Sequence, residues 1–242
     1  MNKIAVTNQK GGVGKTLTVL NAAHGLALRG YRVLMIDCDP QAALSTIYLR
    51  PPITRSMFDL LIEGGNPLDY IVEVRERLSL LPADPRLARL EGSQGDYSLK
   101  DRLGSLKGFD FILVDCGPSL GQLVVSVLNY VRWDIIPVKT DYFSLQALPK
   151  THGLIEVVKE LNPGLRILGH LPCQYDQRRI LDREALLSLR RDYKAVFAPI
   201  RQNVSLAESV SWGQSIFEYR KRSTGAEDYG KLVKSIIKGV KA

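Results

Sequence analysis

The sequence is poor in cysteine, and its three cysteines, Cys38, Cys116 and Cys173, lie far apart in the chain. Their number is odd and no two of them have the C-x-x-C spacing of a zinc or redox site. These features argue against a disulfide scaffold and favour thiols that are kept reduced in the cytoplasm.

Long apolar runs are also missing. No uninterrupted apolar stretch approaches the roughly 20 residues that a membrane span needs. The first residues lack the charged and then apolar pattern of a secretory leader, so we expect a protein that stays in the cytoplasm. The 242 residues are 45% hydrophobic and 24% charged. That composition is typical of a globular protein with one sizeable core.

Residues 3–16 carry the strongest pattern, an apolar run followed by a glycine-rich turn that ends in Gly-Lys-Thr. A strand, a glycine-rich loop and a helix form a cradle for phosphate. Glycines let backbone N–H groups converge on phosphate oxygens, and the helix N-terminus adds partial positive charge. In such a loop Lys15 reaches the β- and γ-phosphates, and the Thr16 hydroxyl is a ligand of Mg²⁺.

The loop departs from the usual G-x-x-x-x-G-K-[ST] pattern at its beginning, because Gln9 stands where the first glycine is expected. Lys10 adds a second positive charge, which repels the first unless an anion compensates both. Residues 10–16 resemble the deviant phosphate loop of the ParA/MinD ATPases, in which the early lysine crosses a dimer to the partner's nucleotide. The resemblance implies ATP and Mg²⁺ as cofactors, an ATP-sandwich homodimer, and Lys10 and Lys15 as catalytic residues. It places the nucleotide on Lys10, Gly11, Gly12, Val13, Gly14, Lys15, Thr16 and Leu17, the last of which replaces the usual threonine and contributes mainly its backbone N–H.

Two carboxylates stand at the end of the next predicted strand, residues 32–37, and just beyond it. Asp37 and Asp39 stand at its carboxyl end, the edge of an open α/β sheet where ligands bind. An isolated Asp-x-Asp-Pro can also be a turn and cap. Residues 37–41, however, resemble the D-x-D-P-Q motif of the same family. That resemblance implies that Asp39 orients or activates the attacking water and that Asp37 supports Mg²⁺.

A further apolar strand, residues 109–115, ends in Asp115, which is the form of a Walker B motif. With a phosphate loop upstream, this pattern predicts that Asp115 holds Mg²⁺ through a water, opposite Thr16. Residues 115–120 resemble the family's D-x-P-P-S-L motif. Gly117 stands where the first proline is usual, which predicts a looser loop.

Apolar strands alternate with helical patterns along the chain. The alternation predicts one α/β domain over residues 1–242, with a mostly parallel sheet, helices on both faces and right-handed crossovers. Together with the loop, it predicts a P-loop NTPase of the deviant Walker A type. We assign no chemistry to residues 42–108.

The positive charge is concentrated late in the sequence. Residues 174–242 contain 14 Lys or Arg and 8 Asp or Glu, so they carry most of the net charge of +8. The surplus indicates a polyanion or an anionic membrane as partner, although a merely solvated surface has the same signature. No recognition-helix or zinc-finger motif is present, so we expect DNA binding without sequence specificity, through phosphates. The clusters suggested for DNA contact are Arg190, Arg191, Lys194, Arg220, Lys221 and Arg222.

Residues 199–229 resemble the C-terminal signature of the ParA/Soj proteins, so the resemblance runs from residue 3 to about residue 237. It implies that the adenine is bordered by the side chain of Asn203 and mainly by the backbone of Arg201. The final predicted helix, residues 227–241, is basic and amphipathic. It could lie on an anionic membrane, but we favour packing of its apolar stripe on the sheet.

The resulting hypothesis is a nucleoid-associated ParA/Soj-type ATPase that hydrolyses ATP to ADP and phosphate. It would segregate a chromosome or plasmid, or position another cargo, and be stimulated by a ParB-like centromere-binding or adaptor protein. The first alternative is a MinD-like ATPase that cycles on membranes through the last helix. The second is a small-substrate amidoligase on the same fold, for which the sequence shows no second-substrate site.

Overall fold

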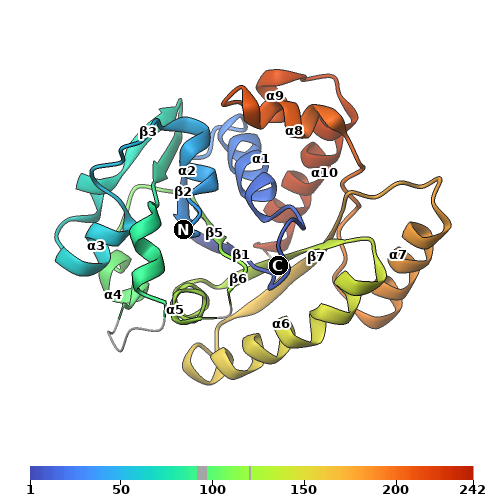
Figure 1. Ribbon diagram of the computed structural model, residues 1–242, viewed down its shortest axis with the longest axis horizontal. Coiled ribbons are helices and arrows are strands. Elements are labelled where there is room, and N and C mark those ends of the chain that lie inside the picture. The colour runs from blue at the N-terminus through green and yellow to red at the C-terminus, as the bar shows by residue number, and fades with distance from the viewer. Residues whose placement is uncertain (92–96, 120, 242) are drawn as a thin grey trace.

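The computed structural model describes residues 1–91, 97–119 and 121–241, and a seven-stranded sheet runs through its centre (Figure 1). The strand order is β3-β4-β2-β5-β1-β6-β7, and all neighbours are parallel except β3 and β4. The strands are β1 (Asn2–Val6), β2 (Val33–Cys38), β3 (Val72–Arg75), β4 (Leu78–Leu81), β5 (Phe111–Cys116), β6 (Trp133–Lys139) and β7 (Arg166–Cys173).

Helices cover both faces of this sheet, so the predicted fold class is confirmed. In Figure 1, α1, α8, α9 and α10 lie on one side, while α3, α4, α5 and α6 lie on the other. The helices are α1 (Lys15–Ala27), α2 (Ala43–Tyr48), α3 (Met57–Glu63), α4 (Leu99–Leu103), α5 (Gln122–Tyr130), α6 (Tyr142–Leu161), α7 (Ile180–Asp192), α8 (Val204–Ser211), α9 (Ile216–Tyr219) and α10 (Thr224–Gly239), with 3-10 turns η1 (Pro67–Tyr70) and η2 (Pro85–Arg89).

The two helical layers bury two separate apolar cores, one on each face. Along β2, Val33 and Met35 contribute to one core, and Leu34 and Ile36 contribute to the other. This division follows from the two-residue period of a strand. It also explains why the central strands are continuous apolar runs in the sequence.

The apolar stripe of α10 is turned inward. Leu232, Val233 and Ile236 are buried, and α10 packs on α1. The helix therefore turns these three side chains toward the body of the protein, which agrees with the packing that we favoured over a membrane. Within the described ranges, no helix combines the length and apolarity that crossing a bilayer requires.

The start of α6 is set by a side-chain cap, not by apolar periodicity in the sequence. The helix begins at Tyr142 because Asp141 caps it, with Oδ1 accepting a hydrogen bond of 2.8 Å from the Ser144 backbone N–H. The apolar period becomes visible only after the first turn, whose Tyr142 and Phe143 are exposed. A cap therefore set this boundary, and the periodicity alone did not reveal it.

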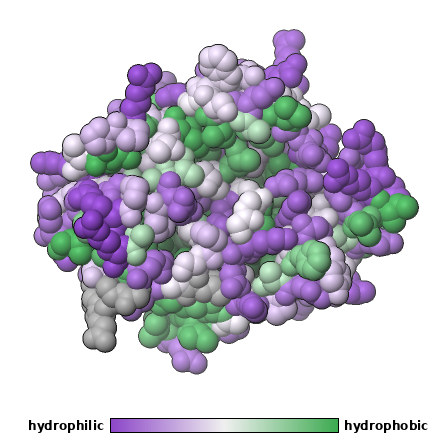
Figure 2. Space-filling view, viewed as in Figure 1, coloured by the Kyte–Doolittle hydropathy of each residue, from purple (hydrophilic) through white to green (hydrophobic). Residues whose placement is uncertain are grey.

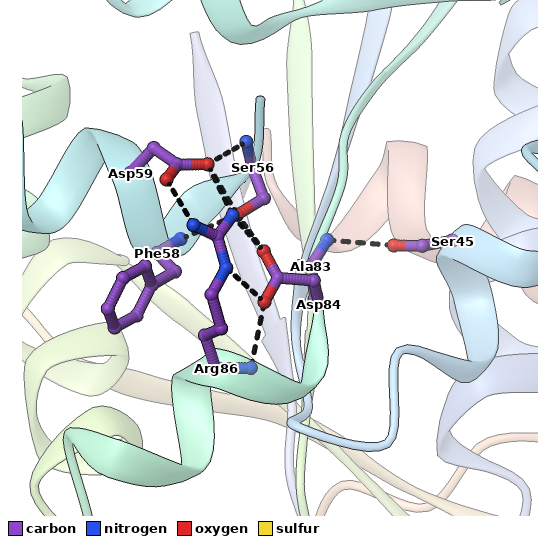
Figure 3. A network of polar contacts seen from close by, with 7 residues as sticks. All are labelled: Ser45, Ser56, Phe58, Asp59, Ala83, Asp84 and Arg86. Carbon is purple, nitrogen blue, oxygen red and sulfur yellow. Dashed lines mark hydrogen bonds and ion pairs between the residues drawn. The ribbon is translucent and has the colours of Figure 1, made fainter. Parts of the chain in front are cut away.

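A polar cluster joins α3 to η2 beside the sheet (Figure 3). The Arg86 guanidinium donates to both carboxylate oxygens of Asp59 at 2.8 Å and to Asp84 at 2.8 and 3.0 Å. Ser56 donates to Asp84, and Arg86 lies over the Phe58 ring. One guanidinium thus forms ion pairs with two largely buried carboxylates.

We expect Arg86→Met to lower the free energy of unfolding by about 2 kcal/mol. Removing one partner of a buried ion pair costs more than this, but the Arg86 side chain is 37% exposed and solvent screens part of the effect. The control is Arg89→Met, on the same turn but exposed, which should stay within about 0.5 kcal/mol of wild type in urea denaturation.

The same variant should alter the acid sensitivity of the fold. Burial tends to raise the pKa of Asp84, but hydrogen bonds from Arg86 and Ser56 outweigh it and lower that pKa. Asp84 therefore stabilises the fold at neutral pH, and this contribution is lost as the pH falls through the lowered pKa. Equal acid sensitivity in wild type and Arg86→Met would contradict this assignment.

A candidate nucleotide site at the carboxyl edge of the sheet

The predicted phosphate loop connects β1 to α1 at the carboxyl edge of the sheet. Gly12 and Gly14 have φ angles of 71° and 102°, a left-handed region that favours glycine. A Cβ placed on Gly11 or Gly12 would meet nothing within 4 Å, so the loop is open on the side of its backbone. Gly14 directly precedes Lys15, the first residue of α1, so the loop ends at a helix N-terminus.

Lys15 lies inside the curve of this loop. Its side-chain Nζ donates to the carbonyl oxygens of Asn8 at 3.1 Å and of Lys10 at 3.3 Å, and the residue is buried. Burial lowers the pKa of the Lys15 ammonium, and the charges of Asp115 and Asp39 oppose this only in part. An anion such as a phosphate, bound in the loop, would compensate the buried positive charge.

Two buried carboxylates face each other on neighbouring strands. The register of β2 and β5 pairs Asp37 with Asp115, and neither residue is exposed to solvent. Burial and then mutual repulsion raise the pKa of Asp115, although the Thr16 hydroxyl lowers it in part. Among the described residues, neither Asp115 oxygen has a partner that meets hydrogen-bond geometry. Two unneutralised carboxylates beside a threonine hydroxyl suit a hard divalent cation such as Mg²⁺.

Asp37 differs from Asp115 because its oxygens are already engaged. Oδ1 accepts from the Asp39 backbone N–H at 3.0 Å, and Oδ2 accepts from the backbone and the hydroxyl of Ser45 at 2.8 and 2.7 Å. Burial raises the pKa of Asp37 despite these three hydrogen bonds. The arrangement suits a carboxylate that supports a cation from beside Asp115.

Asp39 lies against the loop that follows β5. Its Oδ1 accepts from the Gln41 backbone N–H at 2.9 Å. A Cβ built on Gly117 would come within 3.3 Å of that oxygen, so glycine at this position leaves room for the carboxylate. The structure therefore brings the two acidic segments of the sequence into contact. Residue 120, the last of the second motif, lies outside the described residues.

A pocket of about 340 Å³ lies between the phosphate loop and the 200–207 segment. Gly14 and Leu17 line one side, and Arg201 and Asn203 line the other, as the adenine assignment requires. The Arg201 guanidinium and backbone N–H are bound to Asp228, so the side chain is held away by α10. Because Asp228 also takes the backbone N–H, the adenine role of the Arg201 backbone stays a prediction.

The Asn203 side chain is already partly engaged. Its Oδ1 caps α8 by accepting from the Ser205 N–H at 2.9 Å, and its Nδ2 donates to Thr224 at 2.8 Å. One N–H and one lone pair remain for a base. The adenine role of Asn203 therefore stays a prediction, joined by a structural role in capping α8.

Sequence reasoning missed the contacts that the phosphate loop makes with Asp141, Ser144 and Gln174. Gln174 Nε2 donates to the Gly12 carbonyl at 2.7 Å. Lys10 Nζ donates to Asp141 at 3.0 Å and to the Ser144 hydroxyl at 2.8 Å. The only available signal was position, because Gln174 and Asp141 both follow strands that end at this edge of the sheet.

The basic residues suggested for DNA contact form two groups. One lies at the end of α7 and just beyond it, and the other lies between α9 and α10, and Figure 1 shows these elements apart. Arg191 pairs with Asp192, whereas Arg220 donates to the Ser205 hydroxyl. A single chain therefore does not gather the two groups into one patch.

Apolar side chains are exposed at the start of α7. Ile180 and Leu181 are 61% and 74% exposed, and they line a pocket that also includes Asp141 and Gln174. Figure 2 shows apolar colour at the end of the molecule formed by α7, as at several other places on this face. The phosphate loop thus has exposed apolar side chains as near neighbours.

Comparison with known proteins agrees with this geometry. The family model described as an AAA domain matches residues 1–167. The chain is 36% identical to the chromosome-partitioning ATPase Soj of Thermus thermophilus, over 98% of this chain and 96% of that protein. It is 33% identical to the chromosome partitioning protein ParA of Caulobacter vibrioides, over 97% and 93% of the two chains.

Two solved structures have the same fold. One is a cobyrinic acid a,c-diamide synthase from Mycobacterium smegmatis with bound ADP and magnesium, with a TM-score of 0.87, 31% identity and coverage of 100% of this chain and 96% of that chain. The other is a putative plasmid partition protein from Borrelia burgdorferi bound to AMPPNP, with a TM-score of 0.86, 21% identity and 98% coverage of both chains. At 21% identity, the second likeness concerns the fold alone.

Proposed function

The chain belongs to the Soj/ParA family of chromosome-partitioning ATPases, and from that premise we propose that it is an ATP-driven switch that segregates DNA or another cargo. ATP with Mg²⁺ would assemble two chains into a dimer that binds DNA without sequence preference. Hydrolysis, stimulated by a ParB-like partner, would release the DNA. The observation that carries this proposal is the juxtaposition of the Lys10–Lys15 loop with Asp37, Asp39 and Asp115 at one sheet edge.

Each group at this edge has a chemical task in the proposal. Lys15 and the loop N–H groups neutralise and orient the phosphates, and Asp39 positions the attacking water. Thr16 and Asp115, supported by Asp37, would hold Mg²⁺, which supplies positive charge to the phosphate oxygens when bound. Lys10 crosses to the nucleotide of the partner subunit. The exposed apolar residues at the start of α7 support a second chain packing near the loop.

The test of this function is DNA binding against salt, with a duplex of arbitrary sequence and with ATP, ADP or no nucleotide. We expect tight binding only with ATP, because dimerisation brings the basic groups of two chains onto one duplex. If about six phosphates are neutralised, affinity should fall by roughly 10³ between 50 and 200 mM salt.

Variants that remove positive charge should distinguish residues that contact DNA from residues that only add to the net charge. Replacing Arg220 and Arg222 by alanine should weaken binding and lower the salt slope by about two. Arg32→Ala is the control, because this exposed residue precedes β2 at the opposite edge of the sheet. Equal binding in all three nucleotide states would overturn the switch.

An amidoligase is the second candidate, favoured by the likeness to the diamide synthase structure. The two candidates differ in what they require for ATP turnover. A partition ATPase releases phosphate with DNA and a partner protein, whereas an amidoligase needs a carboxylic acid and an amine donor. Turnover that rises with DNA and a ParB-like partner, with no carboxylic acid or amine donor present, would favour the partition ATPase.

A further inference from the structure

Ser45, in α2, joins two segments that sequence reasoning did not connect. Its hydroxyl donates to Asp37 Oδ2 at 2.7 Å, and its oxygen accepts from the Ala83 backbone N–H at 2.8 Å. All three residues are 0% exposed. Because Ala83 supplies the hydrogen of its own bond, the hydroxyl hydrogen of Ser45 is directed to Asp37.

The position of Ala83 is fixed by its surroundings. It lies between β4 and η2, next to Asp84, which is held by Ser56 and Arg86. The backbone of Pro82, on its other side, accepts from the Met57 N–H at 2.7 Å. Figure 3 shows Ser45 reaching Ala83 from α2 while the Arg86 cluster holds the far side of the same turn.

The turn that ends with η2 also contacts the loop that follows the second acidic strand. Glu91, just after η2, accepts from the Ser119 hydroxyl at 3.2 Å. Ser119 belongs to the loop that contains Gly117, against which Asp39 rests. Both acid-bearing segments therefore touch residues 83–91, one through Ser45 and one through Ser119.

We propose that Ser45 is a positioning residue of the nucleotide site, which fixes the Asp37 carboxylate beside Asp115 by tying it to Ala83. The inference rests on the proposed nucleotide and Mg²⁺ site, and it names how that site is held. A buried hydroxyl destabilises the fold unless it is hydrogen-bonded. Here it makes one hydrogen bond as donor and one as acceptor, and each end is anchored on a different segment.

The test measures how strongly nucleotide binding depends on Mg²⁺. We would titrate a fluorescent ATP analogue in EDTA and in increasing Mg²⁺, for wild type, Ser45→Ala and Ser45→Thr. Groups that orient a metal-supporting carboxylate typically contribute 10- to 100-fold to metal affinity. We therefore expect Ser45→Ala to need at least about tenfold more Mg²⁺ for half-saturation.

Nucleotide binding in EDTA depends on the phosphate loop and should change less than twofold. Ser45→Thr retains the hydroxyl and should restore the Mg²⁺ dependence to within about threefold of wild type. Thr46→Ala is the matched control, because Thr46 is adjacent and exposed and its hydroxyl donates to the Ala43 carbonyl within α2. If Ser45→Ala does not fold, Ser45→Cys, which keeps the size but donates weakly, replaces it.

An unchanged Mg²⁺ requirement in Ser45→Ala would overturn the inference. So would an equal loss of binding in EDTA, which would show that the substitution damages the fold. A wild-type protein whose nucleotide binding ignores Mg²⁺ would overturn it as well. By contrast, a wild type that binds nucleotide with Mg²⁺ but not DNA would overturn the proposed partition function and leave the role of Ser45 standing.

Discussion

Lys10→Ala should remain a monomer when ATP is added. In the proposed dimer this lysine reaches the phosphates of the partner's nucleotide, where removing one member of a desolvated charge pair costs about 2–5 kcal/mol. The dimer should therefore weaken by at least about 30-fold. Sedimentation velocity with ATP measures the change directly. A Lys10→Ala variant that dimerises with ATP as wild type does would show that Lys10 does not cross.

In the single chain Lys10 is bound within its own subunit, so a variant that frees it should have the opposite effect to Lys10→Ala. Nζ is bound to Asp141 and Ser144 at the start of α6, so crossing requires these contacts to break. Asp141→Asn removes the negative partner, and we expect it to dimerise at a lower ATP concentration than wild type. Lys139→Ala is the control, because its Nζ lies 3.7 Å from the same carboxylate but outside the loop.

Asp39→Ala should lower ATP hydrolysis by about 10²- to 10³-fold, since a group that positions or activates the nucleophile contributes on this scale. ATP binding and dimerisation should persist, because Lys15 and the loop backbone are unchanged. DNA binding with ATP should then last longer than in wild type. Phosphate release under single-turnover conditions, together with DNA dissociation, measures both effects.

Asp39→Asn separates charge from position. The amide oxygen can still accept from the Gln41 backbone N–H, so the local turn is retained while the negative charge is lost. If activation of water needs the charge, Asn and Ala should be equally slow. Asp110→Ala, at the amino edge of the sheet beside Arg32, should hydrolyse ATP at the wild-type rate. Normal hydrolysis by Asp39→Ala would contradict the assignment.

The main strands and the phosphate loop could be predicted because each is written in a short continuous pattern. Buried parallel strands are apolar runs, and the acids near the ends of β2 and β5 mark their carboxyl ends. The start of α6 could not be predicted from periodicity, because its cap and first turn carry no apolar period. The antiparallel β3 at the sheet edge was not foreseen, since only its pairing with β4 makes it a strand.

The candidate site also contains residues that the sequence identified and residues that it did not. Sequence supplied the residues of the loop and the acids, because their spacing is tied to phosphate and metal chemistry. It assigned no chemistry to residues 42–108, yet Ser45 and Ala83 within that stretch support Asp37. Their role requires three chain segments to meet, and no local spacing encodes such a meeting.

The sequence by itself determined the fold class, the glycine-rich loop and the acids that form the candidate site. Periodicity, glycine content and charge are patterns of a few consecutive residues. Only the tertiary structure decided what those groups touch. The strand register set Asp37 opposite Asp115, and packing buried the apolar face of α10. The start of α6 placed Asp141 next to Lys10. Each contact joins residues far apart in the chain, so its geometry exists only once the sheet and its helices have assembled.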